Sequence, residues 1–382
     1  MKLIAVLLLA SLTIPLMAQE LTFYGPRPEP TQYSKRTVTF SPAGDLKADI
    51  YRPAQSRGKL PIMLFFNGVG KQLGPVLFRD HPQYAGWGKA ATTAGLAGIV
   101  MESDPRDARH SFDLLLSFLR QHAAELGVDP EQMVVWSCSA NAKVGTAIVT
   151  DPKLTNVRGG IIYYGSGDVG SYRSDEPVLV VRAGLDSEGL NRGLDAIAAA
   201  AIKSNAPWSV VNYSGGRHGF DVYDDTPQTR AIIDQTLAFA RQAVSPEAQA
   251  VLAAHQKAAE AAGFAYAEQW PQAEAAYRQI LAANPSDHMS HWKLAQILAG
   301  ENKHKEAIEH YQRALDLGNP NRGWISIASA KSAMGIGDRQ LALRFLEGLR
   351  GINVMIQQMK TAPEFASLRD DPQFKEIAAS GN

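Results

Sequence analysis

A serine, an aspartate and a histidine each stand a few residues beyond a separate apolar segment of this 382-residue chain: Ser139, Asp186 and His218. A serine hydroxyl is barely ionised at neutral pH and becomes a nucleophile only with a base within hydrogen-bond reach. Histidine suits that task because its pKa lies near neutral pH, and a carboxylate on its second ring nitrogen fixes the tautomer. Their order along the chain therefore predicts a nucleophile–acid–base triad for acyl transfer.

The segment around Ser139 is typical of a buried strand that breaks sharply into a helix. Such a turn needs small residues two positions before and two positions after its exposed centre, because neighbouring backbone comes very close. Ser137 is small enough, whereas Asn141 is larger than this position favours. A turn centred on Cys138 would place the bulk of Trp136 at the first of these positions, so Ser139 is the expected nucleophile. Two alternatives stay open: the Ser139 hydroxyl only caps the helix, or Cys138 is a reactive thiol.

The acid and the base stand in loops that offer alternatives of their own. Asp186 could be a solvated loop carboxylate, with Glu188 or Asp195 in its place. His218 could be a structural histidine, yet glycines flank the Arg217–His218 pair, which predicts unusual backbone angles there. A further loop, Asn67-Gly68-Val69-Gly70, could direct backbone N–H groups at a developing oxyanion together with the N–H of Ala140. The same four residues also fit an ordinary turn.

These loops need a scaffold, and the first two thirds of the chain predict one. Apolar strands alternate with helices up to about residue 243, which indicates a mostly parallel sheet covered on both faces. The carboxyl ends of such strands share one edge, where ligands bind. The expected strands span residues 37–40, 46–51, 61–66, 96–101, a segment at 134, 160–164, 178–181 and 208–213, and the expected helices 84–94, 108–126, 190–203 and 226–243.

The motifs at Ser137–Asn141, Asp186 and Gly216–Phe220 together resemble the α/β-hydrolase superfamily, in particular its dienelactone hydrolase-like and small esterase members. The resemblance covers residues 35–243. It implies Ser139 as nucleophile, Asp186 as acid, His218 as base, and the backbone N–H groups of Val69 and Ala140 as the oxyanion hole. Ser137 and Asn141 stand where the common motif has glycines. Dienelactone hydrolases proper carry cysteine at the centre of the turn, so their substrate is not implied here.

The short connection between Tyr164 and Pro177 has no room for a large lid over the site. An open site is therefore expected, or one shielded by residues 71–83 or by a second domain. The histidines show no ligand spacing typical of a metal site, and we expect no cofactor.

Charge and the N-terminus limit the classes of partner. Lys plus Arg and Asp plus Glu each number 38, so no basic field is available for nucleic acid. Residues 1–18 combine one positive charge, a short apolar core and a small residue at the end, which is typical of a cleaved export signal. The apolar run of residues 3–17 is short for a bilayer span and contains Pro15. We expect a periplasmic or secreted protein with no transmembrane segment after cleavage.

Composition changes near residue 244 to Ala, Gln, Glu and Leu without strand-like runs, which predicts an all-helical domain over residues 244–382. Residues 270–277 align with residues 304–311 at a spacing of 34, and the same spacing places Leu341 and Phe345 in a third, degenerate repeat over 323–349. This period and its small and aromatic positions resemble the tetratricopeptide (TPR) pattern. A capping segment is expected over residues 362–377. The resemblance implies a groove for a peptide or protein, whereas packing on the first domain or self-association is the alternative.

The sequence as a whole predicts an α/β-hydrolase domain over residues 19–243 followed by a TPR array. The leading hypothesis is an exported serine hydrolase that cleaves small esters through a Ser139 acyl-enzyme. One alternative is a non-catalytic interaction protein in which the repeats act and the hydrolase domain is a platform. The other is a peptidase that uses the same triad.

Overall fold

A computed structural model describes residues 32–67, 69–73, 76–169 and 171–381 of the chain. The predicted export signal, residues 1–18, lies outside the described residues. The chain divides into two compact units, one that ends at Gln249 and one that begins at Ala250. Among the described residues, no helix combines the length and apolar character needed to cross a bilayer.

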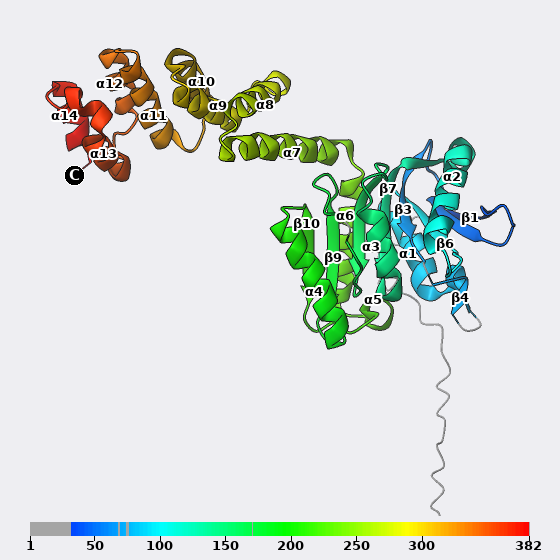
Figure 1. The fold of residues 1–382 in the computed structure, drawn as a ribbon. Coiled ribbons are helices and arrows are strands. Elements are labelled where there is room, and N and C mark those ends of the chain that lie inside the picture. Colours follow the sequence, from blue (N-terminus) through cyan, green and yellow to red (C-terminus); the bar gives the residue numbers. More distant parts are fainter. Residues whose placement is uncertain (1–31, 68, 74–75, 170, 382) are drawn as a thin grey trace, which may run out of the picture. The chain divides into compact units, whose positions relative to one another are not determined.

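The first unit contains an eight-stranded sheet and a separate two-stranded hairpin (Figure 1). The large sheet has the order β1-β2-β6-β3-β7-β8-β9-β10, in which β2 pairs antiparallel with both of its neighbours and all pairs from β6 onward are parallel. The strands are β1 (Tyr33–Thr39), β2 (Lys47–Pro53), β3 (Leu60–Phe65), β4 (Gln72–Leu73), β5 (Val76–Leu77), β6 (Ala97–Met101), β7 (Val128–Cys138), β8 (Val157–Tyr163), β9 (Val178–Ala183) and β10 (Trp208–Tyr213).

Helices cover both faces of this sheet because its central strands are apolar on both sides. Phe65 and Trp136 pack in one core with residues of α1 and α6, while Leu64 and Val135 pack in a second core with residues of α2, α3 and α4. The helices are η2 (Phe78–Asp80), α1 (Pro82–Thr93), α2 (Ala108–Leu126), η3 (Ser139–Asn141), α3 (Ala142–Val149), α4 (Glu188–Lys203), α5 (Phe220–Tyr223) and α6 (Pro227–Ala243).

The predicted fold class is confirmed: a mixed, mostly parallel sheet between two helical layers is followed by an all-helical region. The sequence missed the β4–β5 hairpin and the short α5. The strand predicted at residue 134 is also longer than expected, since β7 begins at Val128. Val128 and Asp129 pair with Leu60 and Pro61, and a bulge then restores the register at Met133.

In the second unit, successive helices from α8 to α12 pack against one another (Figure 1). Its elements are α7 (Pro246–Tyr266), whose first residues belong to the first unit, α8 (Trp270–Ala283), α9 (His288–Gly300), α10 (His304–Asp316), α11 (Arg322–Gly335), α12 (Arg339–Glu347), α13 (Asn353–Thr361), η4 (Pro363–Leu368) and α14 (Pro372–Ala379). The predicted capping segment corresponds to η4 and α14, whereas α13 was not predicted.

Small buried residues show where the repeats pack. They shift the alignment of the third repeat by one residue from the predicted one. Ala273, Ala307 and Ala342 are fully buried at equivalent places in α8, α10 and α12, whereas Leu341, which a strict spacing of 34 selects, is only partly buried. Leu346 rather than Phe345 is then the equivalent of Tyr311. The spacing grows to 35 because α11 has 14 residues where α9 has 13.

Candidate active site

Ser139 stands at the sharp turn between β7 and the helix that follows it. β7 ends at Cys138, η3 begins at Ser139, and α3 continues from Ala142. Ser139 has a φ of +50°, a backbone conformation that residues other than glycine rarely adopt. Such strain costs about 1–3 kcal/mol and tends to occur at functional positions. The turn therefore holds the Ser139 hydroxyl out at the carboxyl edge of the sheet.

The small residues that the turn needs are supplied partly by its surroundings. Gly145 faces Ser137 so closely that a Cβ on Gly145 would lie 2.3 Å from the Ser137 Oγ, and a Cβ on Gly165 would lie 2.6 Å from the Ser139 carbonyl oxygen. Asn141, the larger residue in the motif, adopts ordinary right-handed angles, so no glycine is required there. Its buried side chain donates a hydrogen bond of 2.5 Å to the Tyr84 hydroxyl.

The structure brings Ser139, His218 and Asp186 together in one hydrogen-bonded chain. The Ser139 Oγ lies 2.8 Å from the His218 Nε2, and the His218 Nδ1 lies 2.6 Å from the Asp186 Oδ2. Because an ionised carboxylate only accepts hydrogen bonds, the imidazole carries its proton on Nδ1 and presents Nε2 to the serine. The other Asp186 oxygen accepts the Ser187 N–H at 2.7 Å, which fixes the carboxylate plane.

Close contacts between two loops place the acid beside the base. The loop after β9 carries Asp186, and its Leu185 N–H donates to the Gly216 carbonyl at 2.8 Å in the loop that carries His218. A Cβ on Gly184 would lie 2.4 Å from the Ser214 oxygen, so only glycine lets these loops approach. Gly219, directly after the histidine, has a φ of +71° and starts α5. The unusual backbone predicted there is present at this glycine.

The two alternative acids are engaged elsewhere. Asp195 pairs with Arg182 at 2.8 Å, and Glu188 is a solvent-exposed side chain whose nearest cation, Arg192, is 3.7 Å away. Of the three acidic residues weighed from the sequence, Asp186 alone has a hydrogen bond to His218 among those between described residues.

The loop after β3 has its own internal hydrogen bonds. The Asn67 side chain donates to the Gly70 carbonyl at 2.6 Å, and its Oδ1 accepts the Val69 N–H at 3.1 Å. Val69 was predicted to donate to an oxyanion, and in this structure its N–H points at Asn67, so it must be shared or released when a substrate binds. Ala140 lies in the first turn of η3, where N–H groups have no acceptor within the helix. Both roles stay predictions.

Cys138 is a buried thiol at the end of β7, with the Tyr84 hydroxyl 3.9 Å from its sulfur. Burial raises the pKa of the Cys138 thiol far above its ordinary value, with the nearby Asp221 carboxylate as a second cause. A protonated, buried thiol is a poor nucleophile.

We therefore expect Cys138 in the folded protein to resist alkylation by iodoacetamide at pH 8, and Cys138→Ala to keep most of any Ser139-dependent activity. Intact-protein mass spectrometry, with and without urea, measures the first effect. Rapid alkylation of the native chain, or loss of activity in C138A at unchanged thermal stability, would show that the thiol takes part.

A buried polar network that the sequence did not reveal lies against the His218 ring. Asp221 is fully buried, and its two oxygens accept hydrogen bonds from Gln83, Trp87 and Tyr164. The Tyr164 ring lies 4.8 Å from the His218 ring, centroid to centroid. Asp221 stands three residues after the histidine, yet its donors come from α1 and from the end of β8. Neither periodicity nor motif spacing indicates such a contact.

The imidazole of His218 is partly exposed within the first unit, and whether residues 71–83 or the second unit shield it stays a prediction. The His218 side chain is 41% exposed, whereas the Asp186 side chain is 6% exposed. The described part of the connection between Tyr164 and Pro177 contains no helix or strand, and Gly167 packs on the first turn of α3. No group of three or more metal-ligating side chains occurs in the described part of the chain.

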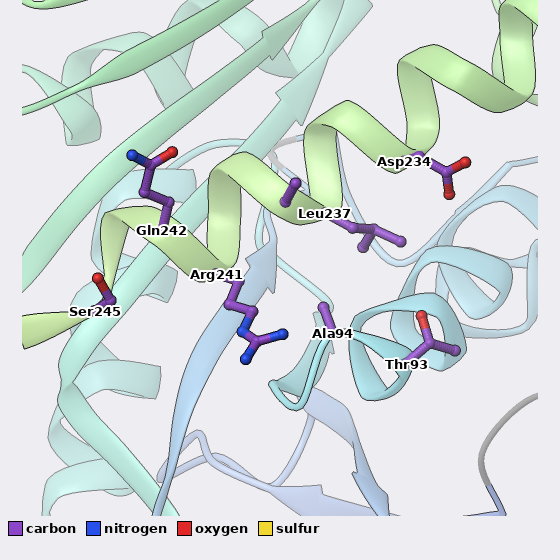
Figure 2. A pocket seen from close by; sticks show the side chains of 8 residues that line it. Thr93, Ala94, Asp234, Leu237, Arg241, Gln242 and Ser245 are labelled. Atoms are coloured by element: carbon purple, nitrogen blue, oxygen red, sulfur yellow. The ribbon is translucent and has the colours of Figure 1, made fainter. Parts of the chain in front are cut away.

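A cavity of about 450 Å³ lies elsewhere in the first unit, between the end of α1 and the second half of α6 (Figure 2). Helices that follow parallel strands run back toward the opposite edge of the sheet, so this cavity lies away from the loops that carry Ser139, Asp186 and His218. Its lining contains neither histidine nor cysteine, and we assign it no chemistry. The lining residues are Thr93, Ala94, Asp234, Leu237, Ala238, Arg241, Gln242 and Ser245.

Sequence comparisons identify the repeats but no full-length relative. Residues 259–322 match the tetratricopeptide repeat family. This match spans the end of α7 through α10 and falls on the first two predicted repeats. No curated protein matches the chain in sequence.

Solved structures similar to this chain include several esterases. A thermostable esterase from Pseudomonas putida ECU1011 is 16% identical with a TM-score of 0.46, covering 57% of this chain and 84% of its own. Brefeldin A esterase, a bacterial homologue of human hormone sensitive lipase, is 14% identical with a TM-score of 0.45 over 58% and 79%. The carboxylesterase EstE1, from a metagenomic library, is 16% identical with a TM-score of 0.47 over 58% and 92%. Likeness at this level carries no activity over to this chain.

Proposed function

We propose that this protein is a serine hydrolase that cleaves carboxylic esters by acyl transfer through Ser139. The observation that carries the proposal is the hydrogen-bonded chain from the Ser139 Oγ through His218 to Asp186. Three separate loops supply these side chains, and each distance lies in the range that proton transfer needs. The strained φ of Ser139 supports the same reading, because a plain helix cap requires no such conformation.

The residues perform the reaction in two halves. As the Ser139 Oγ attacks the ester carbonyl carbon, its proton passes to the His218 Nε2, and Asp186 stabilises the resulting imidazolium. Collapse of the tetrahedral intermediate breaks the carbon–oxygen bond to the alcohol, which leaves with the proton from Nε2. Water then attacks the acyl-enzyme, gives its proton to Nε2, and the acid is released as Ser139 regains its hydrogen. The Ala140 N–H, with Val69 if its N–H is released from Asn67, supports the oxyanion in both halves.

The direct test is hydrolysis of short-chain nitrophenyl esters by the purified full-length protein. We expect release of nitrophenolate that depends on Ser139. Folded protein with no hydrolysis of acetate, butyrate or hexanoate esters above the uncatalysed rate would reject the esterase function. It would favour the non-catalytic alternative, in which the repeats bind a partner and the first unit is a platform. A peptide substrate should be assayed beside the esters, because a peptidase would use the same three residues.

Apolar side chains exposed beside the catalytic loops suggest that the ester carries an apolar group. Val69, Leu185 and Tyr223 are exposed, and each stands within a few residues of Asn67, Asp186 or His218 respectively. Substrate contact would bury such side chains, and each buried methylene contributes about 0.8 kcal/mol.

Leu185→Ser should therefore raise KM for hexanoate esters about fivefold and leave acetate esters almost unchanged. Ile202→Ser is the matched control, since Leu185 and Ile202 are both 69% exposed but Ile202 lies at the far end of α4. Steady-state kinetics over a series of acyl lengths measures the effect. Equal shifts in both variants would show that Leu185 does not contact the substrate.

For the second unit we propose binding of a peptide or protein through the repeats. The tetratricopeptide match supports this role, and Met289 and Trp324 are exposed on the first helices of the second and third repeats. Export, cleavage after Ala18 and the domain limits of residues 19–243 and 244–382 stay proposals from the sequence.

A further inference from the structure

The Asp221 carboxylate is buried without a cation. Its exposed fraction is 0%, and none of the ion pairs between described residues includes it. Burying a charge is costly unless hydrogen bonds replace the lost water. Three donors do so here: the Trp87 Nε1 at 2.8 Å and the Gln83 Nε2 at 3.0 Å to one oxygen, and the Tyr164 hydroxyl at 2.6 Å to the other.

A carboxylate accepts all three hydrogen bonds in the geometry observed. Gln83 and Trp87 donate through nitrogen and the Tyr164 hydroxyl gives its proton to Asp221, so an asparagine in place of Asp221 would turn its own N–H₂ toward one of these groups and lose or reverse that hydrogen bond. The Gln83 Nε2 also donates to the Tyr164 hydroxyl at 2.6 Å, so that hydroxyl accepts one hydrogen bond and gives another. The orientation of the Tyr164 ring is thereby fixed at its hydroxyl end.

Tyr164 is held equally firmly at its backbone. Its φ is +32°, which is an outlier for a bulky side chain, and its N–H donates to the Val181 carbonyl at 2.8 Å. The next residue, Gly165, lies against the backbone of Ser139. A strained residue that is fixed at both ends persists only where the surrounding structure over-determines it.

The Tyr164 ring, held in this way, packs against the imidazole ring of His218. The Tyr164 and His218 rings lie 4.8 Å apart at 59°. The His218 side chain is 41% exposed, so the part of the imidazole that faces solvent is not held in place there. Asp221 also belongs to α5, which begins two residues after the histidine, so the same carboxylate anchors the chain on which His218 stands.

We propose that Asp221 is a positioning residue that, through the Tyr164 ring and the start of α5, holds the His218 imidazole between Ser139 and Asp186. The inference rests on the proposed hydrolase function for its kinetic consequence but not for its structural one. Asp221 touches no reacting atom. It fixes the angle at which Nε2 meets the Ser139 hydroxyl, and small misplacements of catalytic groups can cost up to about a hundredfold in rate.

The neighbouring Tyr163 provides a matched control. Its hydroxyl makes an equally short buried hydrogen bond, 2.6 Å to the Thr236 Oγ1, but its ring contacts described between aromatic side chains do not include His218. Tyr163→Phe therefore deletes one buried phenol hydrogen bond, whereas Tyr164→Phe deletes two, the one that its hydroxyl gives to Asp221 and the one that it accepts from Gln83. Only Tyr164→Phe removes hydrogen bonds that restrain the Tyr164 ring beside the His218 imidazole.

The experiment compares Y164F, D221N and Y163F in the full-length protein by ester kinetics, thermal melting and the far-downfield proton NMR signal of the His218 Nδ1–H, assigned by its absence in H218Q. We expect Y164F to lower kcat about threefold to tenfold and D221N tenfold or more, with KM changed less than twofold and the Nδ1 proton signal shifted or broadened. Y163F should keep the wild-type kcat and the wild-type signal even if its melting temperature falls as far.

Equal behaviour of Y164F and Y163F in kcat and in the proton signal would overturn the proposal and leave the network as a contribution to stability alone. If D221N fails to fold, Y164F decides, because it keeps the ring. If the wild type hydrolyses no ester, the proposed function fails, but the Nδ1 proton signal still reports whether the network positions the imidazole.

Discussion

Ser139→Ala is expected to abolish ester hydrolysis, with a loss in kcat of about 10⁵-fold or more. The variant removes the only hydroxyl that the His218 Nε2 contacts in the described structure, at 2.8 Å, so no acyl-enzyme can form. Alanine replaces serine without adding bulk to the close-packed turn, and the fold should be retained. Initial rates with nitrophenyl butyrate, together with a thermal melt, measure both effects.

Ser137→Ala is the control for this variant. The Ser137 hydroxyl is buried and has no hydrogen-bond partner among the described residues, and it stands only two positions from Ser139. Its loss should leave most of the rate. An S139A protein with the full wild-type rate would exclude Ser139 as the nucleophile.

Asp186→Asn is expected to lower kcat by about 10⁴-fold while substrate binding changes little. The Asp186 Oδ2 accepts the His218 Nδ1 proton at 2.6 Å, which leaves Nε2 free to take the proton of Ser139. An amide that donates to Nδ1 would stabilise the opposite tautomer, in which Nε2 is already protonated and cannot act as a base. It would also remove the negative charge that stabilises the imidazolium.

Steady-state kinetics of D186N, Glu188→Gln and Asp195→Asn separate the three acids. Glu188→Gln and Asp195→Asn should retain nearly all of the activity, because Glu188 is solvent-exposed and Asp195 pairs with Arg182. A large loss in either of these variants, with D186N close to wild type, would move the acid to another position along the chain.

Alternating apolar strands and helices predicted the fold class, and the order of the loops along the chain selected three side chains that hydrogen bonds join in the structure. Strands of a parallel sheet deliver their following loops to one edge, so Ser139, Asp186 and His218 had to lie on the same side of the molecule. The choice of Asp186 over Asp195 could not be decided in the same way. Which carboxylate reaches His218 depends on the path of the loop after β9, and a close contact between Gly184 and Ser214 sets that path.

Neither the fit of Asn141 in the turn nor the place of Asp221 beside the site could be predicted, and the physical reason is the same. Whether Asn141 crowds the turn depends on its backbone angles and on Tyr84, which lies 57 residues earlier in the chain. The hydrogen bond between Gln83 and Asp221 spans 138 residues. Local pattern predicts what a strand or a helix does with its own residues, whereas these contacts arise from how α1 packs against the sheet.

In the second unit, too, local pattern predicted the helices but not every packing position. Period and small residues predicted paired helices, and buried alanines lie at their crossings. A strict period failed at Leu341 because α11 gains one residue, which the burial of Ala342 reveals.

The role of Ser139 as the nucleophile is tested by labelling the native full-length protein with a fluorophosphonate probe, followed by mass-spectrometric localisation of the adduct. The probe reacts only with a serine that a neighbouring base activates. We expect one adduct, on the peptide that contains Ser139, and its loss in His218→Ala. Folded protein that takes up no probe, or that carries the adduct on a residue other than Ser139, would contradict that role.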